Sequence, residues 1–406
     1  MIYNVVIYFV LWGIAIASLF NEKVRKMWRG ERDAFRILRE NVDPTERYIW
    51  FHAASLGEFE QGRPLMERIR RDYPQYKILL TFYSPSGYEV RKNYEGADII
   101  CYMPVDTRLN AIRFLRLVRP VMAFFIKYEF WQNYLNELQR RNIPVYSVSS
   151  IFRKEQIFFR WYGKSYRKVL NTFTHLFVQD EASVQLLRTI GITNTTVVGD
   201  TRFDRVLEIC RQAKELPLVE KFKGNHTAFV AGSSWGPDED IFIPYLNAHP
   251  EVKLIIAPHV IDESHLKEII GKLNRTVVRY TQATEEKGKK ADCLLIDCFG
   301  LLSSIYRYGE IAYIGGGFGV GIHNVLEAAV YGMPVIFGPN NKRFREAQGL
   351  LQCKGGFEIQ GAEDFKKIMD NFLNNYEALD KAGKKAGNYV RDNAGALEKI
   401  MHTVTL

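Results

Sequence analysis

The chain has 406 residues, of which 47% are hydrophobic and 25% are charged, an ordinary composition for a globular protein of about two domains. It contains no low-complexity tract and no sustained heptad pattern, which excludes a disordered or a fibrous protein. The net charge of +9 favours an anionic partner such as a nucleic acid, a phosphorylated ligand or an anionic membrane. The five cysteines have no CxxC spacing, which argues against a zinc site or a disulfide framework.

The first twenty residues, MIYNVVIYFVLWGIAIASLF, form an uncharged apolar segment. As a helix, twenty residues rise about 30 Å, enough to cross the hydrocarbon core of a bilayer. Basic residues follow this segment rather than precede it, which is the reverse of a cleaved signal peptide. They are Lys23, Arg25, Lys26, Arg29, Arg32, Arg36 and Arg39. The positive-inside rule therefore predicts an uncleaved anchor over 1–22 with the remaining chain in the cytoplasm, and the basic flank attracts anionic headgroups. Whether the anchor spans the bilayer or lies in its interface stays open.

From about residue 48, strand-like runs alternate with amphipathic helices. In the first half, strands are expected at 48–54, 77–82, 122–126, 145–148 and 175–178, with a short run at 196–199 that closes it, and helices are expected at 62–72, 109–118 and 183–190. A charged stretch around 205–223 contains no strand and is interpreted as a hinge. The second half has expected strands at 227–231, 252–257, 276–278, 292–296, 311–314 and 334–337. Such alternation is typical of parallel sheets with helices on both faces, so we expect two α/β domains, 30–204 and 205–406.

Chemistry in such sheets gathers where strands end. The first strand leads into HAASLGE, in which Glu58 is a candidate base toward a hydroxyl. Ser55 and Glu58 also have the spacing of a capping box, so catalyst and helix cap are equal alternatives. The second strand leads into TFYSPSG, whose hydroxyls and Gly87 suit a sugar or phosphate ligand, or a plain turn. In KYEFW, at the end of a very apolar strand, Lys127 and Glu129 are either cleft chemistry or a local ion pair.

The most informative stretch is GGGFGVG, which follows the strand at 311–314 and leads into a helix expected at 322–331. The N–H groups of a glycine-rich loop before a helix can bind an anion. On that helix, His323 and Asn324 fall in the first turn, and Glu327 shares a face with His323. A phosphate on the loop and a ribose diol on Glu327 would make a nucleotide site. The alternative is a helix end packed on the sheet. The GxGxxG pattern is absent, which argues against NAD.

Taken in order, these segments resemble the bacterial 3-deoxy-D-manno-octulosonic acid (Kdo) transferases of lipid A and lipopolysaccharide core biosynthesis, glycosyltransferase family 30. The resemblance runs from the anchor to about residue 350. The matching segments are HAASLGE, TFYSPSG, YMPVD, YEFWQN, VQDEAS, VGDTRFD and GIHNVLEAAVYGMPVIFGP. The resemblance implies an α/β fold of the GT-B type, with two Rossmann-like domains that face a central cleft and an N-terminal membrane-anchor helix.

The resemblance also implies an activity. The enzyme would move Kdo from CMP-Kdo, with inversion, to the tetraacyl disaccharide bisphosphate precursor of lipid A, lipid IVA. No metal or other cofactor and no nucleic acid partner would take part. The enzyme would sit at the inner membrane with its catalytic domains toward the cytoplasm. Positive charge would draw in the phosphates of the acceptor. Some of the four arginines on the helix expected at 62–72 would face the lipid; the alternative is that this helix face is simply solvated. These are Arg63, Arg68, Arg70 and Arg71.

Individual residues acquire roles from the resemblance. Glu58 matches the family's proposed general base and Glu129 an acid that assists the transition state. Arg202 stands where the family usually has Lys, and a cation there can stabilise the departing phosphate. Together with the glycine loop, the expected CMP site comprises Pro258, His259, Phe299, Gly300, Gly315, Gly316, Gly317, Asn324 and Glu327. The expected acceptor contacts are Ser55, Gly57, Ser86, Gly87 and Arg153. The chain departs from the family pattern at Lys127, at Leu301 and in the segment after His259.

Two other functions remain as alternatives. A non-catalytic protein that binds anionic lipid would explain the anchor and the charge, but not the glycine loop with Asn324 and Glu327. A GT-B-like sugar-nucleotide epimerase would explain the loop, but a soluble substrate needs no anchor.

Overall fold

The computed structural model describes residues 2–405 and divides the chain into two compact units. The first unit comprises Met1–Asp204 and Gly395–Leu406, and the second comprises Arg205–Ala394. The chain leaves the first unit within helix α8 (Thr201–Arg211) and returns to it after helix α17 (Tyr376–Asp392). The predicted second domain, 205–406, is therefore too long, because its last residues belong to the first unit.

Packing explains this correction. Helix α18 (Ala396–Thr403) buries Ala396 and Ile400 in a core cluster of the first unit. The amides of Gly395 and Ala396 donate to the Asp204 carboxylate at 2.9 and 3.0 Å. An amphipathic helix at the end of a chain shows which stripe is buried, but its sequence does not say against which domain.

The first unit contains a parallel seven-stranded sheet in the order β3-β2-β1-β4-β5-β6-β7. Its strands are β1 (Tyr48–Ala53), β2 (Lys77–Phe82), β3 (Ile99–Tyr102), β4 (Met122–Ile126), β5 (Val145–Ser150), β6 (His175–Val178) and β7 (Thr195–Val197). Strand β3 was not expected from the sequence. At four residues it is too short to show a clear pattern of its own.

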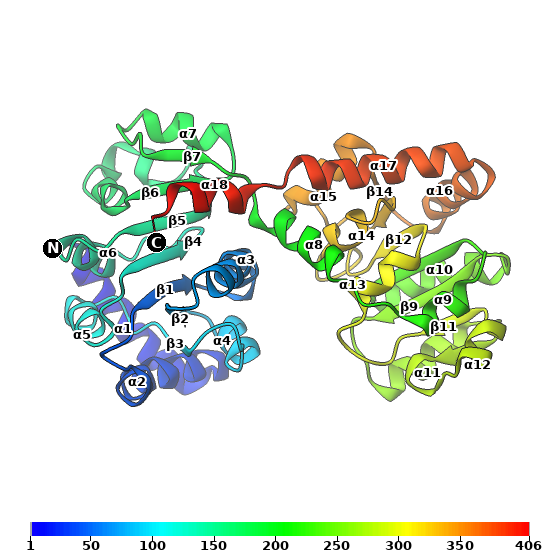
Figure 1. Ribbon diagram of the computed structural model, residues 1–406, viewed down its shortest axis with the longest axis horizontal. Helices are drawn as coiled ribbons and strands as arrows, with labels where there is room; N and C mark the ends of the chain where they lie inside the picture. Colours follow the sequence, from blue (N-terminus) through cyan, green and yellow to red (C-terminus); the bar gives the residue numbers. More distant parts are fainter. Residues whose placement is uncertain (1, 406) are drawn as a thin grey trace. The chain divides into compact units, whose positions relative to one another are not determined.

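Helices cover both faces of this sheet (Figure 1). Helix α3 (Leu56–Asp72) packs with α18 on one face, and α2 (Glu22–Asn41), α5 (Arg108–Val118) and α6 (Gln132–Arg140) pack on the other. The remaining elements are α4 (Pro85–Arg91), α7 (Glu181–Arg188) and the short 3-10 helices Ile157–Phe159, Trp161–Gly163 and Tyr166–Thr172. The four arginines of α3, some of which were expected to face lipid, all pair with carboxylates.

The second unit repeats the plan with the order β10-β11-β9-β8-β12-β13-β14, again parallel. Its strands are β8 (Ala228–Ser234), β9 (Lys253–Pro258), β10 (Val277–Arg279), β11 (Cys293–Leu295), β12 (Ile311–Ile314), β13 (Val335–Phe337) and β14 (Gly356–Glu358). Its helices include α9 (Pro217–Lys223), α10 (Gly236–Asn247), α11 (Glu263–Lys272), α12 (Glu285–Lys290), α13 (Leu302–Ile305), α14 (Leu326–Ala329), α15 (Arg345–Cys353) and α16 (Ala362–Asn374). The sequence interpretation of a doubly wound α/β fold is thus confirmed.

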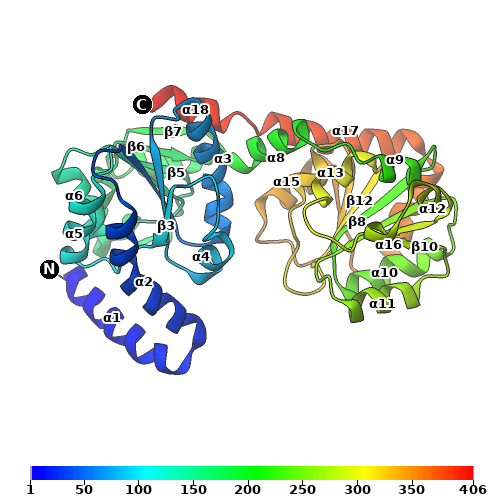
Figure 2. The same ribbon diagram turned by 60° about the horizontal axis from the view of Figure 1, so that its bottom comes forward.

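The N-terminal apolar segment forms helix α1 (Ile2–Phe20), which turns at Asn21 into α2 and packs beside it (Figure 2). Within residues 2–405, Tyr3–Phe20 is the one stretch of helix long and apolar enough to cross a membrane, and only 11% of it is buried. An exposed apolar surface of this extent is typical of a protein–protein or membrane interaction site.

Candidate active site

Each sheet has one switch point, a place where two neighbouring strands are followed by connections that run toward opposite edges of the sheet. In the first unit this place lies between β1 and β4, and in the second between β8 and β12. Open α/β sheets bind ligands beyond the carboxyl ends of the strands at such a switch point. Glu58 lies in the first turn of α3, the helix that follows β1, and Glu129 lies in the turn after β4. Topology therefore brings these two predicted acidic residues to the same edge.

Glu58 lies half-buried in the first turn of α3. The Ser55 hydroxyl donates a hydrogen bond to its carboxylate, while the Ser55 side chain makes no cap bond to the helix. In the capping-box alternative the Ser55 hydroxyl would accept from the backbone of α3, so that reciprocal arrangement is not formed. The Ser55 hydroxyl instead holds the Glu58 carboxylate in place, and the intervening Gly57 is exposed.

The start of α4 lies directly against this turn. The Ser84 amide donates to the Ala54 carbonyl at 2.7 Å. A Cβ on the buried Gly87 would lie 2.3 Å from the Phe82 ring and 3.1 Å from the Ser55 backbone, so only glycine allows this approach. Gly87 therefore has a packing role here, while the neighbouring Ser86 is exposed beside the turn.

A chain of buried hydrogen bonds leads to Glu129. The Trp50 Nε1–H donates to Thr81 Oγ1 at 2.8 Å, and Thr81 Oγ1 lies 2.9 Å from His52 Nδ1. Since the indole N–H can only donate, the Thr81 hydroxyl accepts from it, and the Phe51 carbonyl at 3.3 Å and His52 Nδ1 are the two acceptors within reach of the hydroxyl's own proton. Because a carboxylate oxygen accepts, the 3.1 Å contact between His52 Nε2 and Glu129 Oε2 assigns the imidazole proton to Nε2.

Glu129 has a second donor. The Trp131 Nε1–H donates to the same oxygen, Oε2, at 2.6 Å, and the Glu129 side chain is only 12% exposed. These two donors hold the carboxylate in one orientation. The sequence interpretation left open an ion pair between Lys127 and Glu129. The structure places Lys127, with φ of 62°, close enough to Asp200 to favour ionisation of that carboxyl.

Arg202, the predicted phosphate-binding cation, forms an ion pair with Asp200. Its guanidinium lies 2.8 Å from Asp200 Oδ2, which also accepts from Gln61 Nε2 at 3.0 Å. Burial opposes ionisation of Asp200, but Arg202 outweighs it and holds the pKa of that carboxyl below its usual range. The Arg202 side chain remains 31% exposed. Arg153 is exposed near this edge, with its guanidinium carbon 6.0 Å from the ring centroid of Tyr128, the neighbour of Glu129.

In the second unit, three rings stack at the carboxyl edge of the sheet. The ring centroids of Trp235 and His259 are 4.7 Å apart, and those of His259 and His323 are 4.3 Å apart. The Trp235 Nε1–H donates to His323 Nε2 at 3.2 Å. Burial and the neighbouring His259 lower the pKa of His323 to about 4, so its imidazole is neutral at pH 7 and accepts this hydrogen bond. The sequence prediction included His259 but missed Trp235.

The glycine loop differs from its prediction. Helix α14 begins only at Leu326, so His323 and Asn324 precede it rather than fill its first turn. The Gly315 amide donates to the Gly232 carbonyl at 3.0 Å, and the Gly316 amide to Asp238 Oδ2 at 2.9 Å. Those two N–H groups are thus used inside the unit and not offered to an anion. A Cβ on Gly317 would lie 2.5 Å from the Gly338 backbone, so that glycine permits close packing.

Other predicted nucleotide contacts lie near this edge. Asn324 is exposed, its Oδ1 accepts from the Leu326 amide at 3.1 Å, and its Nδ2 donates to Glu327 Oε1 at 2.9 Å. This bond orients the Glu327 carboxylate. Pro258 ends β9, and Phe299 is exposed in the loop after β11, next to Gly300 with φ of 85°.

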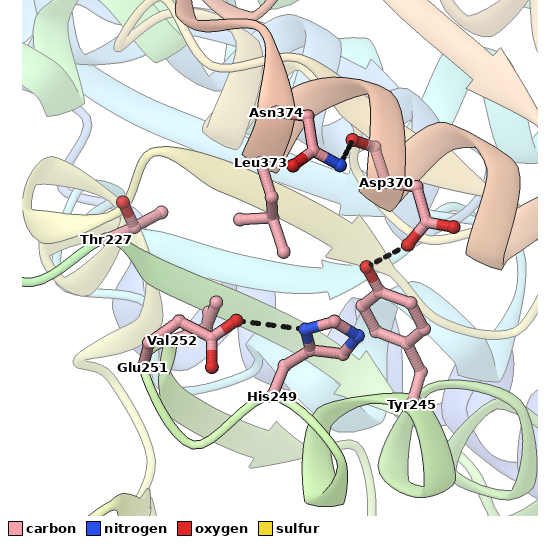
Figure 3. A pocket seen from close by; sticks show the side chains of 8 residues that line it. All are labelled: Thr227, Tyr245, His249, Glu251, Val252, Asp370, Leu373 and Asn374. Carbon is pink, nitrogen blue, oxygen red and sulfur yellow. Dashed lines mark hydrogen bonds and ion pairs between the residues drawn. The ribbon is translucent and has the colours of Figure 1, made fainter.

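A cavity of about 230 Å³ in the second unit lies elsewhere (Figure 3). Thr227 and Val252, which line it, come immediately before β8 and β9, so the cavity is at the amino edge of the sheet. Its polar groups are already paired, Tyr245 with Asp370 and His249 with Glu251. It therefore does not coincide with the predicted donor site.

Two parallel, doubly wound units define an α/β protein with a GT-B-like fold. The sequence profile described as "3-Deoxy-D-manno-octulosonic-acid transferase (kdotransferase)" matches residues 29–205. The 3-deoxy-D-manno-octulosonic acid transferase of Rickettsia bellii (strain RML369-C) is 25% identical over 412 residues, covering 98% of this chain and 96% of that one. The enzyme of the same name from Aquifex aeolicus (strain VF5) is 27% identical, over 82% and 88% of the two chains.

Among solved structures, the UDP-GlcNAc 2-epimerase from Neisseria meningitidis aligns with a TM-score of 0.61 at 15% identity, over 88% of this chain and 99% of that one. At that identity the likeness establishes the fold alone. The sequence comparisons extend over nearly the whole chain and confirm its resemblance to the 3-deoxy-D-manno-octulosonic acid (Kdo) transferases.

Proposed function

We propose that this protein transfers Kdo from CMP-Kdo, with inversion, to lipid IVA at the cytoplasmic face of the inner membrane. The observation that carries the proposal is the edge cluster of the first unit, where Glu58 and the doubly held Glu129 lie beyond β1 and β4 within the segment that matches the family. A non-catalytic lipid-binding protein has no use for two oriented carboxylates at a switch point.

The chemical step follows from these residues. Glu58 accepts the proton of the acceptor hydroxyl, and the oxygen attacks the anomeric carbon of Kdo. The bond from that carbon to the CMP phosphate oxygen breaks, and CMP leaves with the electron pair. A single displacement of this kind inverts the anomeric centre. Arg202 compensates the negative charge of the departing phosphate, because its guanidinium is positioned by Asp200 and remains partly exposed.

Glu129 acts differently from Glu58 in this proposal. Its carboxylate is fixed by His52 and Trp131 and faces the positive charge that develops on the sugar as the donor bond breaks. Because this carboxylate is already oriented, little free energy is needed to reorganise it in the transition state. In the second unit, His259, Asn324 and Glu327 would hold the nucleotide, with Glu327 on the ribose diol.

Product analysis tests the proposal. The full chain is incubated with CMP-Kdo and lipid IVA in detergent, and the product is examined by mass spectrometry. We expect the acceptor to gain one or more Kdo units and CMP to accumulate in equal amount, with EDTA leaving the rate unchanged. No Kdo addition to lipid IVA, with CMP-Kdo intact, would refute the acceptor. CMP-Kdo isomerised without transfer would favour the epimerase alternative.

A further inference from the structure

Both ends of α1 are fixed to the same unit. At its start, the Tyr3 hydroxyl donates to Asp106 Oδ2 at 2.6 Å, and Asn133 Nδ2 donates to Asn4 Oδ1 at 2.8 Å. Asp106 is fully buried and also accepts from the Tyr134 amide at 3.0 Å. The first turn of α1 is therefore part of the polar structure of the first unit and not a free end.

The other end of α1 is fixed by a tight turn. The Arg25 guanidinium donates to the Ser18 and Leu19 carbonyls at 2.9 and 2.8 Å and so caps α1. Helix α2 then runs back into the unit, where Ala34 and Leu38 are fully buried in its core. A helix that crosses a bilayer has ends separated by about 30 Å of hydrocarbon. The Tyr3 bonds and α2 instead join both ends of α1 to one globular body (Figure 2).

The two faces of α1 differ in exposure. The inward face, at helical spacing, carries Tyr3, Ile7 and Ser18, the last two buried. The outward face is apolar and exposed, with Phe9 at 70% and Trp12 at 69%. It consists of Val5, Val6, Tyr8, Phe9, Val10, Trp12, Ile16, Leu19 and Phe20. One covered face and one apolar open face are typical of a helix that lies in the plane of a membrane interface.

Neighbouring residues complete an interfacial surface. Tyr166 stacks on Tyr3 with ring centroids 5.9 Å apart, and the preceding 3-10 helix exposes Trp161 at 88% together with Tyr162. Aromatic side chains of this kind gather at the level of the headgroups. On α2, four exposed basic side chains have no ion pair within the described residues and suit anionic headgroups. They are Lys23, Arg29, Arg32 and Arg39.

We propose that α1 does not cross the bilayer but lies in the cytoplasmic leaflet, with its outward face among the acyl chains and both ends on one side. The inference rests on the membrane association in the proposed function and adds its geometry. Asp106 follows β3, and Asn133 follows Trp131, so α1 is tied to the same sheet edge as Glu129. That edge is thereby held at the leaflet, where the sugar headgroup of a lipid acceptor is reached without extracting the lipid.

Topology tests this directly. The full chain carries one epitope tag before Met1 and another after Leu406, and inverted inner-membrane vesicles from expressing cells are treated with protease. We expect both tags to be removed at the same rate, and both to be protected in intact spheroplasts. An N-terminal tag protected in inverted vesicles and cleaved in spheroplasts would overturn the inference while leaving the proposed function intact. A chain that does not sediment with membranes would overturn both.

Trp12 provides an independent depth measurement. It lies midway along α1, so a crossing helix would place it near the bilayer centre and an interfacial helix would place it near the headgroups. The purified chain is reconstituted in vesicles of phosphatidylethanolamine and phosphatidylglycerol with bromine either high or low on the acyl chains. The contribution of Trp12 is the difference in fluorescence quenching between the wild type and W12F. We expect this difference to be larger with the shallow bromines than with the deep ones. Loss mainly from the deep bromines would contradict the interfacial placement.

Discussion

Among the residues that the structure describes, Glu31 is a buried acid without a hydrogen-bond partner. Its side chain lies in α2 at 5% exposure, and neither carboxylate oxygen makes a hydrogen bond. Tyr83 and Tyr102 lie close enough for the Glu31 charge to affect their ionisation, and the Tyr102 hydroxyl is also unpartnered. Burial raises the pKa of Glu31 from 4.5 to about 8. At neutral pH the folded protein therefore holds a proton there that the unfolded chain releases.

The sign and size of the effect follow from linkage. Because the folded state binds this proton more tightly, the contribution of Glu31 to the free energy of unfolding is greatest below about pH 4.5 and falls as the pH rises toward about 8. With those two pKa values, Glu31 alone lowers the free energy of unfolding by about 2.5 kcal/mol between pH 5 and pH 7. A further loss of about 1 kcal/mol follows between pH 7 and pH 8. Glu31→Gln removes this dependence because an amide does not titrate.

Denaturant unfolding followed by tryptophan fluorescence measures this effect, since five of the six tryptophans lie in the first unit. The quantity compared is the unfolding free energy of the first unit at pH 5, 7 and 8. We expect the advantage of Glu31→Gln over wild type to grow by about 2.5 kcal/mol from pH 5 to pH 7. Glu40→Gln, an exposed position on the same helix, is the control and is expected to track wild type. A constant difference between Glu31→Gln and wild type across this range would refute the reasoning.

Three further predictions concern the rest of the molecule. The longer side chain in His52→Gln can keep a donor near Glu129, whereas the shorter one in His52→Asn cannot reach it. We therefore expect the loss of kcat in His52→Asn to be at least tenfold larger than the loss in His52→Gln, with little change in KM for CMP-Kdo. Equal losses of kcat in the two variants would indicate a purely structural histidine. CMP is expected to raise the Tm of the wild type, and Asn324→Ala or Glu327→Ala to remove most of that shift, whereas a full shift in both variants would place the nucleotide elsewhere. Ile400→Ala is expected to destabilise the first unit by about 2–5 kcal/mol in the tryptophan assay, and an effect confined to the second unit would contradict the assignment of α18.

Strong periodic patterns made much of the fold predictable. Long apolar runs such as those of β1 and β4, each followed by glycine or charged residues, predicted the strands of the sheets. They also predicted the sheet edge on which Glu58 and Glu129 lie. The position of α18 was not predictable, because its amphipathic stripe is compatible with either unit. The late start of α14 has a similar origin. Asn324 draws the Leu326 amide into a local turn, and this competes with the helix that the sequence pattern favours.

The hydrogen-bond chain to Glu129 was missed for a different reason. His52 and Thr81 lie in apolar strands, where a polar residue at a buried position is itself a signal. That signal does not name a partner, since Trp50, Thr81 and His52 come together only through the parallel register of β1 and β2. Trp235 was missed similarly, because its contact with His323 joins segments 88 residues apart.

In the proposed mechanism, Glu58 removes the proton from the acceptor hydroxyl. The direct measurement compares the rate of Kdo transfer from CMP-Kdo to lipid IVA by Glu58→Gln and by Glu60→Gln, an acidic neighbour on the same helix that pairs with Arg91. We expect Glu58→Gln to keep the wild-type Tm and CMP-induced shift but to lose transfer by about 100-fold or more, while Glu60→Gln stays near wild type. Transfer by Glu58→Gln within a few-fold of wild type would contradict the account.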